Sequence, residues 1–304
     1  MTHIYRNTSP SGNYDLLIIS LVHQSAGMLY YMAENIKKYV EGKIIWIVHY
    51  NNADPIDENK LPDWVWIVRD IQSTDRCSFS LLFAIQTTLD FAIKNGVKFT
   101  NVLTLSSGSA FFRTFKTPIH ETISLTSHNR KFNPNANLMH EEPIDIQYAG
   151  RCGQHLINSG SSSWQYDMNT SGADKDEFLQ SFMKKRNFTK FLGAQWSGQI
   201  WPYTVAQMLA EDIGFIRKNI VTNPSKNIYA CEEIYLSTYA YNYALRNNLQ
   251  VGHVEVIIDW CNYYMINSID YIKFLRTNYS INSSAVCKLS DDLNDPVRKY
   301  INES

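Results

Sequence analysis

The first hundred residues alternate between short apolar runs and longer stretches with apolar residues at helical spacing. Four runs rich in Val, Ile, Leu and Trp suit strands that are covered on both faces: residues 15–22, 43–48, 64–68 and 101–105. Residues 28–40 and 78–94 repeat apolar positions three and four apart, which predicts helices. Helices between apolar strands indicate an α/β fold, with a central, mainly parallel mixed sheet flanked by helices.

The second half of the chain is less regular. Residues 113–175 contain three prolines and many Asn and Ser, which predicts few regular elements and a functional or mobile segment. Beyond them, the pattern predicts helices over 178–185, 202–215, 232–247 and 270–276, a strand over 254–258, and an apolar run at 285–288 followed by a charged helix. We expect residues 1–304 to form a single domain.

Polar side chains follow the predicted strands at the points where they end. His23 follows the first strand after Val22, Asp70 follows the third, and the turn at 106–109 (Ser-Ser-Gly-Ser) follows the fourth. Ligands of open α/β sheets bind beyond the carboxyl ends of the strands, and a Ser-Gly turn lets a sugar or phosphate approach the backbone. The chain lacks Gly-x-Gly-x-x-Gly and the P-loop pattern, and the turn also fits an ordinary strand exit.

The composition narrows the classes of protein to which the chain can belong. The chain is 44% apolar with a formal net charge of -1, so the charge balance gives no attraction to nucleic acid or anionic lipid. No run of about 18 apolar residues predicts a membrane span, and the first residues lack the apolar core of a signal peptide. The five cysteines are scattered without a Cys-x-x-Cys pair, which predicts reduced thiols, no zinc site and a cytoplasmic protein.

Four blocks, in order along the chain, are similar to the motifs of one enzyme family. They are the helical segment 78–84, Leu-Ser-Ser-Gly-Ser-Ala-Phe at 105–111, Gly-Ala-Gln-Trp at 193–196, and Glu-Glu-Ile-Tyr-Leu-Ser-Thr at 232–238. A shorter match is Val-Cys-Lys at 286–288. In these blocks, which span roughly residues 15–290, the chain resembles glycosyltransferase family 14, the core-2/I-branching N-acetylglucosaminyltransferases and peptide O-xylosyltransferases.

The resemblance implies a GT-A-type fold and an inverting, metal-independent transfer from a UDP-sugar to a hydroxyl of a glycan. The donor would be UDP-xylose or UDP-N-acetylglucosamine, with no metal or other cofactor. Residues 14–112 would form the nucleotide-binding half and residues 113–304 the acceptor-binding and catalytic half. Glu233 matches the family's catalytic glutamate, which takes the proton of the acceptor hydroxyl. Its position at a helix start also stabilises a carboxylate.

The other expected site residues surround the donor and the acceptor. Without a metal, a cation must balance the leaving diphosphate, and Lys288 is the candidate, with Arg276 and Arg298 as alternatives. An aspartate beyond the first strands could accept a hydrogen bond from uracil or ribose. The expected donor-binding residues are Val22, His23, Asp70, Ser106, Ser107, Gly108 and Lys288. On the acceptor side, Trp196 would stack on a sugar ring, with core packing as the equal alternative for its indole, and Glu232 would neighbour the base.

Two other functions stay open. Asp174 and Asp176 form the Asp-x-Asp pattern of metal-dependent GT-A transferases, although a helix N-cap also explains them. Cys287 stands where family 14 has an arginine, and Asn51 stands where an aspartate is usual. These two departures favour a carbohydrate-binding protein that keeps the fold and lacks turnover.

Overall fold

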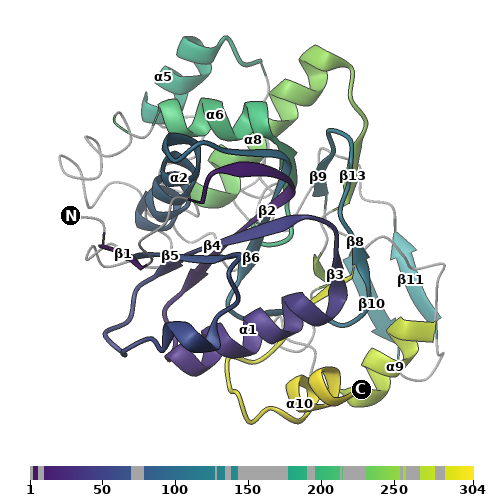
Figure 1. The fold of residues 1–304 in the computed structure, drawn as a ribbon. Coiled ribbons are helices and arrows are strands. Elements are labelled where there is room, and N and C mark those ends of the chain that lie inside the picture. Colours follow the sequence, from purple (N-terminus) through teal and green to yellow (C-terminus); the bar gives the residue numbers. More distant parts are fainter. Residues whose placement is uncertain are drawn as a thin grey trace.

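An eight-stranded mixed sheet with helices on both faces organises the chain (Figure 1). The computed structural model describes residues 3–5, 10–69, 79–126, 129–133, 138–142, 177–189, 196–212, 214, 231–253, 256–257, 268–277 and 285–304. Four neighbouring parallel strands form the centre of the sheet: β5 (Val65–Arg69), β4 (Ile44–Tyr50), β2 (Gly12–Val22) and β6 (Val97–Ser106). The expected α/β architecture with a mainly parallel mixed sheet is confirmed.

The central strands are buried on both faces, as their continuous apolar runs predict. Along β2, Leu17 and Ile19 join the hydrophobic core on one face, and Leu16 and Ile18 join the core on the other. Strand β6 begins at Val97, four residues before the predicted start, because Val97 itself is also buried.

Four further strands extend this sheet at its two edges. β1 (His3–Tyr5) pairs antiparallel with β5. Beyond β6, the order continues with β12 (Ile200–Pro202), β9 (Ile123–Thr126) and β13 (Val251–His253). β12 is antiparallel to both of its neighbours, whereas β13 is parallel to β9. The hydrophobic pattern predicts none of these short strands.

The order of the parallel strands reverses between β2 and β6. From β2 the chain moves outward to β4 and then β5, and it afterwards returns to the other side of β2 to form β6. Near the carboxyl ends of these two strands, Leu21 of β2 lies opposite Ser106 of β6. In open α/β sheets, ligands bind beyond the strand ends at a reversal of this kind.

Helices cover both faces of the sheet and complete two hydrophobic cores (Figure 1). One core includes apolar side chains of α1 (Ala26–Tyr39), α9 (Ile269–Thr277) and α10 (Pro296–Glu303). The other takes α2 (Phe79–Lys94), α5 (Glu177–Arg186), α6 (Tyr203–Glu211) and α8 (Cys231–Asn247). Several predicted helix bounds differ from the observed ones. The first helix covers 26–39 instead of 28–40, since Val40 forms a strand, and the helix expected over 202–215 covers 203–211.

Short strands tie distant segments together. β7 (Ser109–Phe111) pairs with β15 (Val286–Lys288), which pairs with β14 (Val256–Ile257). β3 (Val40–Glu41) pairs with β8 (Phe115–Lys116), and β10 (Asn129–Asn133) pairs with β11 (Leu138–Glu142). A 3-10 turn, η1, covers Glu58–Lys60. The described part of 113–175 is therefore richer in strands than its polar composition predicts.

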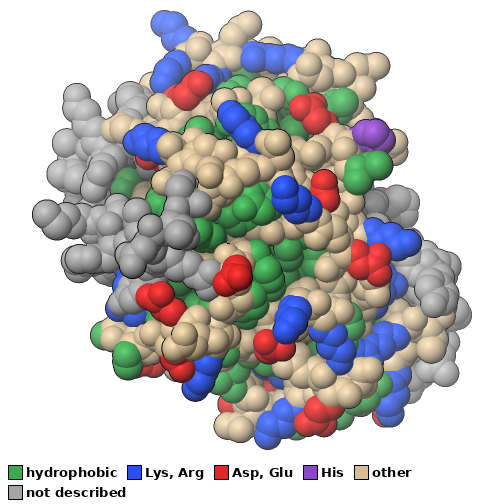
Figure 2. Space-filling model, in the orientation of Figure 1, with side chains coloured by type: hydrophobic (Ala, Val, Ile, Leu, Met, Phe, Trp, Pro, Cys, Tyr) green, Lys and Arg blue, Asp and Glu red, His purple; other side chains and the backbone are tan. Residues whose placement is uncertain are grey.

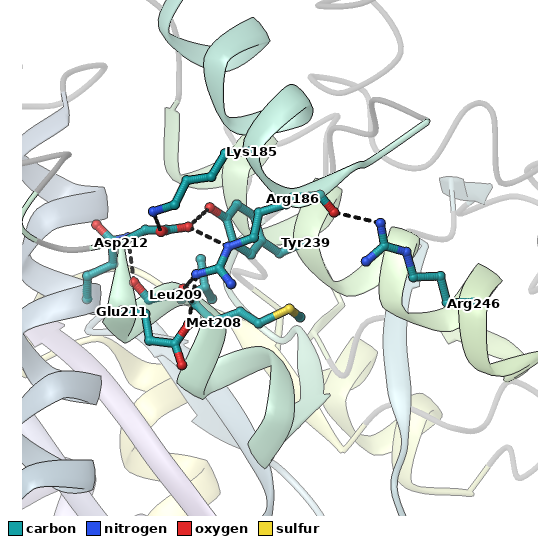
Figure 3. Close-up of polar contacts among 9 residues, drawn as sticks. Lys185, Arg186, Met208, Leu209, Glu211, Asp212, Tyr239 and Arg246 are labelled. Carbon is teal, nitrogen blue, oxygen red and sulfur yellow. Dashed lines mark hydrogen bonds and ion pairs between the residues drawn. The ribbon is translucent and has the colours of Figure 1, made fainter.

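A buried carboxylate joins α5, α6 and α8 on one face of the sheet (Figure 3). The side chain of Asp212, just after α6, is fully buried and accepts hydrogen bonds from Lys185, Arg186 and Tyr239. The Arg186 Nε–Asp212 Oδ2 distance is 3.0 Å, and Arg186 also pairs with the exposed Glu211. Burial, and then the Asp212 charge, raise the pKa of Tyr239 far above its ordinary range, so its hydroxyl stays a donor.

Charged side chains of both signs are interspersed over the face seen in Figure 2. This agrees with the formal net charge of -1. Within the described ranges, no helix has the length and apolarity needed to cross a bilayer.

Candidate functional site

The turn after β6 gathers serine hydroxyls at the carboxyl edge of the sheet. Ser106 Oγ lies 2.9 Å from Ser109 Oγ, which lies 3.1 Å from Ser197 Oγ. The backbone N–H of Ser106 donates to Ser197 Oγ over 3.0 Å. These side chains are buried, so their mutual hydrogen bonds satisfy them and fix the shape of the turn around Gly108.

Lys288 reaches this turn from β15, far away in the sequence. In the antiparallel pair of β15 and β7, Lys288 lies opposite Ser109, and its Nζ donates to Ser106 Oγ over 2.8 Å. The N–H of Leu289 donates to the carbonyl of Gly108 over 2.6 Å, which fixes the strand exit against the turn. The structure therefore brings the predicted cation to the predicted turn.

Glycine at position 108 leaves room for this approach. A Cβ atom there would lie 2.6 Å from Lys288 Nζ, 2.9 Å from Asp291 Oδ1 and 3.0 Å from the Leu289 carbonyl. A side chain at position 108 would therefore push Lys288 or the 289–291 segment away from the turn.

Asp291 is a residue of this site that the sequence reasoning missed. Its Oδ1 atom is buried beside Gly108, on the same side as Lys288. The sequence signal was the polar Ser-Asp-Asp stretch just after a strand, the same signal that marked the other strand ends.

The two alternative cations hold the backbone. Arg298 is fully buried; its Nε donates to the Ser290 carbonyl over 2.5 Å, and its Nη2 lies 3.4 Å from the Ser107 carbonyl. Arg276 donates from Nε to the Phe112 carbonyl over 2.6 Å. Arg298 thus links the Ser107 carbonyl of the turn to the Ser290 carbonyl, whereas Arg276 links α9 to the segment after β7.

Val22 and His23 lie at the carboxyl end of β2, beside the strand-order reversal. The Val22 carbonyl accepts from the N–H of Asn51 over 2.9 Å, and the His23 carbonyl accepts from Asn52 Nδ2 over 3.0 Å. Val22 is buried, while the His23 side chain is exposed and lies 3.3 Å from Gln24 Nε2. Of the two, His23 presents its side chain to solvent at this edge.

Glu232 and Glu233 begin α8 and are both buried, at 4% and 2% exposure. Burial, and then the neighbouring Glu233 charge, raise the pKa of Glu232 to about 8, so Glu232 holds a proton at neutral pH. A protonated Glu232 carries no charge that would repel its neighbour Glu233, and the start of a helix favours a carboxylate charge in general.

A chain of hydrogen bonds ties this helix start to β6. The Ser237 hydroxyl donates to the Glu233 carbonyl over 2.6 Å and accepts from Gln199 Nε2 over 2.9 Å. The N–H of Gln199 in turn lies 3.2 Å from Thr104 Oγ1, two residues before the end of β6. The acidic pair and the serine turn are therefore connected through the same strand.

Trp196 is half-buried and packs against the core that contains α2, α6 and α8. Its carbonyl accepts a hydrogen bond from the Thr104 hydroxyl, so the backbone at position 196 lies against β6. The packing supports core packing for the indole, while the residue as a whole stays partly exposed.

Cys287 faces away from the site. Side chains alternate along a strand, and while Lys288 reaches the serine turn, Cys287 is fully buried in the core of α1, α9 and α10. Burial raises the pKa of its thiol to about 12, so it stays neutral. Position 287, where the resembled family has an arginine, therefore lies on a buried face and not on the face that carries Lys288.

Three predicted residues, Asp70, Asp174 and Asp176, lie outside the described residues, as do positions 193–195 of the Gly-Ala-Gln-Trp block. Across the ranges that are described, no three His, Cys, Asp or Glu side chains are grouped to hold a metal ion. The described site contains a cation, serine hydroxyls, a glycine turn and an acidic helix start. A scan of protein-family models and a search of curated proteins both returned no match for this chain.

Proposed function

We propose that the protein is an inverting, metal-independent glycosyltransferase of GT-A type that moves a sugar from a UDP-sugar to a glycan hydroxyl. One observation carries the proposal: the Lys288 ammonium meets the Ser106–Gly108 turn at the carboxyl end of β6. This contact lies beside the strand-order reversal, where α/β sheets bind nucleotides. The resemblance of four sequence blocks to family 14 supports the reaction class.

In this function, the nucleotide lies along the carboxyl ends of β2 and β6. The uridine of the donor would lie near the exposed His23, and the diphosphate would lie against Gly108 and Lys288. Lys288 would turn from the Ser106 hydroxyl to a phosphate oxygen, since an ammonium bonds more strongly to an anion than to a neutral hydroxyl.

Glu233 acts as the base. The acceptor oxygen attacks the anomeric carbon, the bond from that carbon to the phosphate oxygen breaks, and UDP leaves with the electron pair. The proton of the acceptor hydroxyl passes to the Glu233 carboxylate. Glu232, protonated at neutral pH, leaves the pair with a single negative charge for this step. Lys288 stabilises the charge that develops on the leaving phosphate.

Two substitutions separate binding from turnover. Glu233→Gln should lower UDP release from UDP-xylose or UDP-N-acetylglucosamine in the presence of glycan by about 10²- to 10⁴-fold. It should leave the dissociation constant for UDP nearly unchanged, and Glu211→Gln, on the exposed end of α6, is the matched control. Lys288→Met should weaken binding of UDP and leave binding of uridine unchanged.

Chelation distinguishes the metal-dependent alternative. Activity should persist in EDTA; its loss would favour a metal site that includes Asp174 and Asp176. Full turnover by Glu233→Gln would remove the base assignment, and absence of UDP binding would remove the proposal as a whole.

The second candidate is a carbohydrate-binding protein that lacks turnover. The observation in its favour is the burial of Glu233, because a base must reach the acceptor hydroxyl within hydrogen-bond distance. Glycan binding without UDP release from any of these nucleotide sugars would support this candidate over the enzyme.

A further inference from the structure

Two opposite charges lie on the same side of Gly108, close to the position that a Cβ atom would take. A Cβ atom at this position would lie within 3 Å of both Lys288 Nζ and Asp291 Oδ1. The cation suits a diphosphate, whereas the carboxylate repels one, so an anion site alone does not account for Asp291.

Asp291 has no part in the described hydrogen bonding of its own loop. Asp292 accepts from the N–H of Asn294, and Asp295 caps α10 by accepting from the N–H groups of Val297 and Arg298. By contrast, Asp291 Oδ1 is buried and accepts no hydrogen bond from any residue within the described ranges. A buried carboxylate oxygen without a donor is costly, and the position of Asp291 Oδ1 beside Gly108 and Lys288 makes it available as an acceptor for a ligand that binds at this turn.

We propose that Asp291 selects nucleotide sugars over the bare nucleotide diphosphate. It accepts a hydrogen bond from a hydroxyl of the donor sugar, next to the phosphate that Lys288 holds. UDP brings no sugar hydroxyl to this position, and its terminal phosphate meets the Asp291 charge instead. The inference rests on the proposed function, and it adds the residue that favours substrate binding and product release at the same site.

Two variants at position 291 separate the two effects. Asp291→Asn removes the negative charge but keeps a neutral acceptor, whereas Asp291→Ala removes both. Both variants should bind UDP about tenfold more tightly. UDP-sugar binding should weaken moderately in Asp291→Asn and by about tenfold or more in Asp291→Ala, because a hydrogen bond to a charged acceptor is lost.

The measurement is calorimetric titration of the full chain with UDP, UDP-xylose, UDP-N-acetylglucosamine and UDP-glucose, with urea unfolding to verify the fold of each variant. Asp292→Asn is the matched control, since Asp292 is exposed and its replacement keeps a side-chain oxygen for the Asn294 N–H. The ratio of the UDP to the UDP-sugar dissociation constant should fall at least tenfold in both Asp291 variants and stay unchanged in the control.

Each contrary result has a separate meaning. If the wild type binds UDP-sugars but the ratio is unchanged in the Asp291 variants, or both ligands tighten equally, the selective role is wrong and the proposed function stands. If the wild type binds UDP but none of the UDP-sugars, the selective role is also wrong. If the wild type binds neither, both proposals fail together.

Discussion

The Asp212 cluster provides the sharpest test of what holds the helices on one face of the sheet. Asp212→Asn keeps the size of the side chain and removes its charge. Lys185 and Arg186 then lose their buried counter-ion, and Tyr239 loses an anionic acceptor. We expect the unfolding free energy of the protein to fall, because side chains of both α5 and α8 bind this one carboxylate.

The magnitude follows from the exposure of each partner. Removing one member of a buried ion pair costs about 3–5 kcal/mol. The Lys185 side chain is 51% exposed and can turn to water, while the Arg186 side chain is 17% exposed. We therefore expect about 3 kcal/mol, the lower end of that range, a substantial part of the total stability of about 5–15 kcal/mol typical of a protein.

Glu211→Gln is the matched control, since Glu211 pairs with the same Arg186 from a side chain that is 64% exposed. An exposed pair contributes about 0–1 kcal/mol. The assay is equilibrium unfolding in urea followed by circular dichroism. With a slope of about 3 kcal/mol per molar urea, the midpoint of Asp212→Asn should fall by about 1 M and that of Glu211→Gln by under about 0.3 M. Equal shifts for the two variants would refute the argument from burial.

Two further predictions concern the candidate site. Gly108→Ala should weaken UDP binding by about tenfold, because the methyl group displaces Lys288 or the 289–291 segment. Gly214→Ala is the control, since its Cβ would meet no atom within 4 Å, and it should leave UDP binding unchanged. Equal UDP dissociation constants for the two variants would contradict this prediction. Glu232, with its pKa raised from 4.5 to about 8, binds its proton more tightly when folded, so its stability contribution is complete below pH 4.5 and is lost as the pH rises through 8. Between pH 5 and pH 8 the wild type should lose on the order of 4 kcal/mol more unfolding free energy than Glu232→Gln, measured by urea denaturation at pH 5 and at pH 8. If the unfolding free energies of the two proteins change in parallel with pH, Glu232 does not hold this proton in the folded state.

The central part of the fold could be predicted from the sequence, because its strands are long, apolar and separated by periodic helices. The edge strands could not. β12 is only Ile-Trp-Pro, and a proline within an apolar run argues against a strand unless it stands at an end, as Pro202 does. Its assignment depends on pairing with Leu103 and Val102 of β6, which are distant in sequence.

The candidate site was predictable in its residue types more than in its contacts. Lys288 was a candidate through the resemblance at Val-Cys-Lys and the cation that the expected reaction would need, and the serine turn followed from its place after an apolar strand. The only signal for Asp291 was the polar stretch after a strand, and that signal does not separate a site residue from the turn residue that an aspartate in such a stretch most often is. Asp212 was equally unmarked, because its burial is created only when α5 and α8 cover the end of α6.

The separation of Lys288 from Ser106 by 182 residues has a consequence during protein synthesis. At a translation rate of about 5–20 residues per second, the serine turn is polymerised roughly 9–36 s before its lysine. The four parallel strands are thus synthesised before Lys288 is added to the chain. A nascent polypeptide stalled before β15 would carry the glycine turn without the ammonium group, and the contact between Lys288 and Ser106 forms only in the last stage of translation.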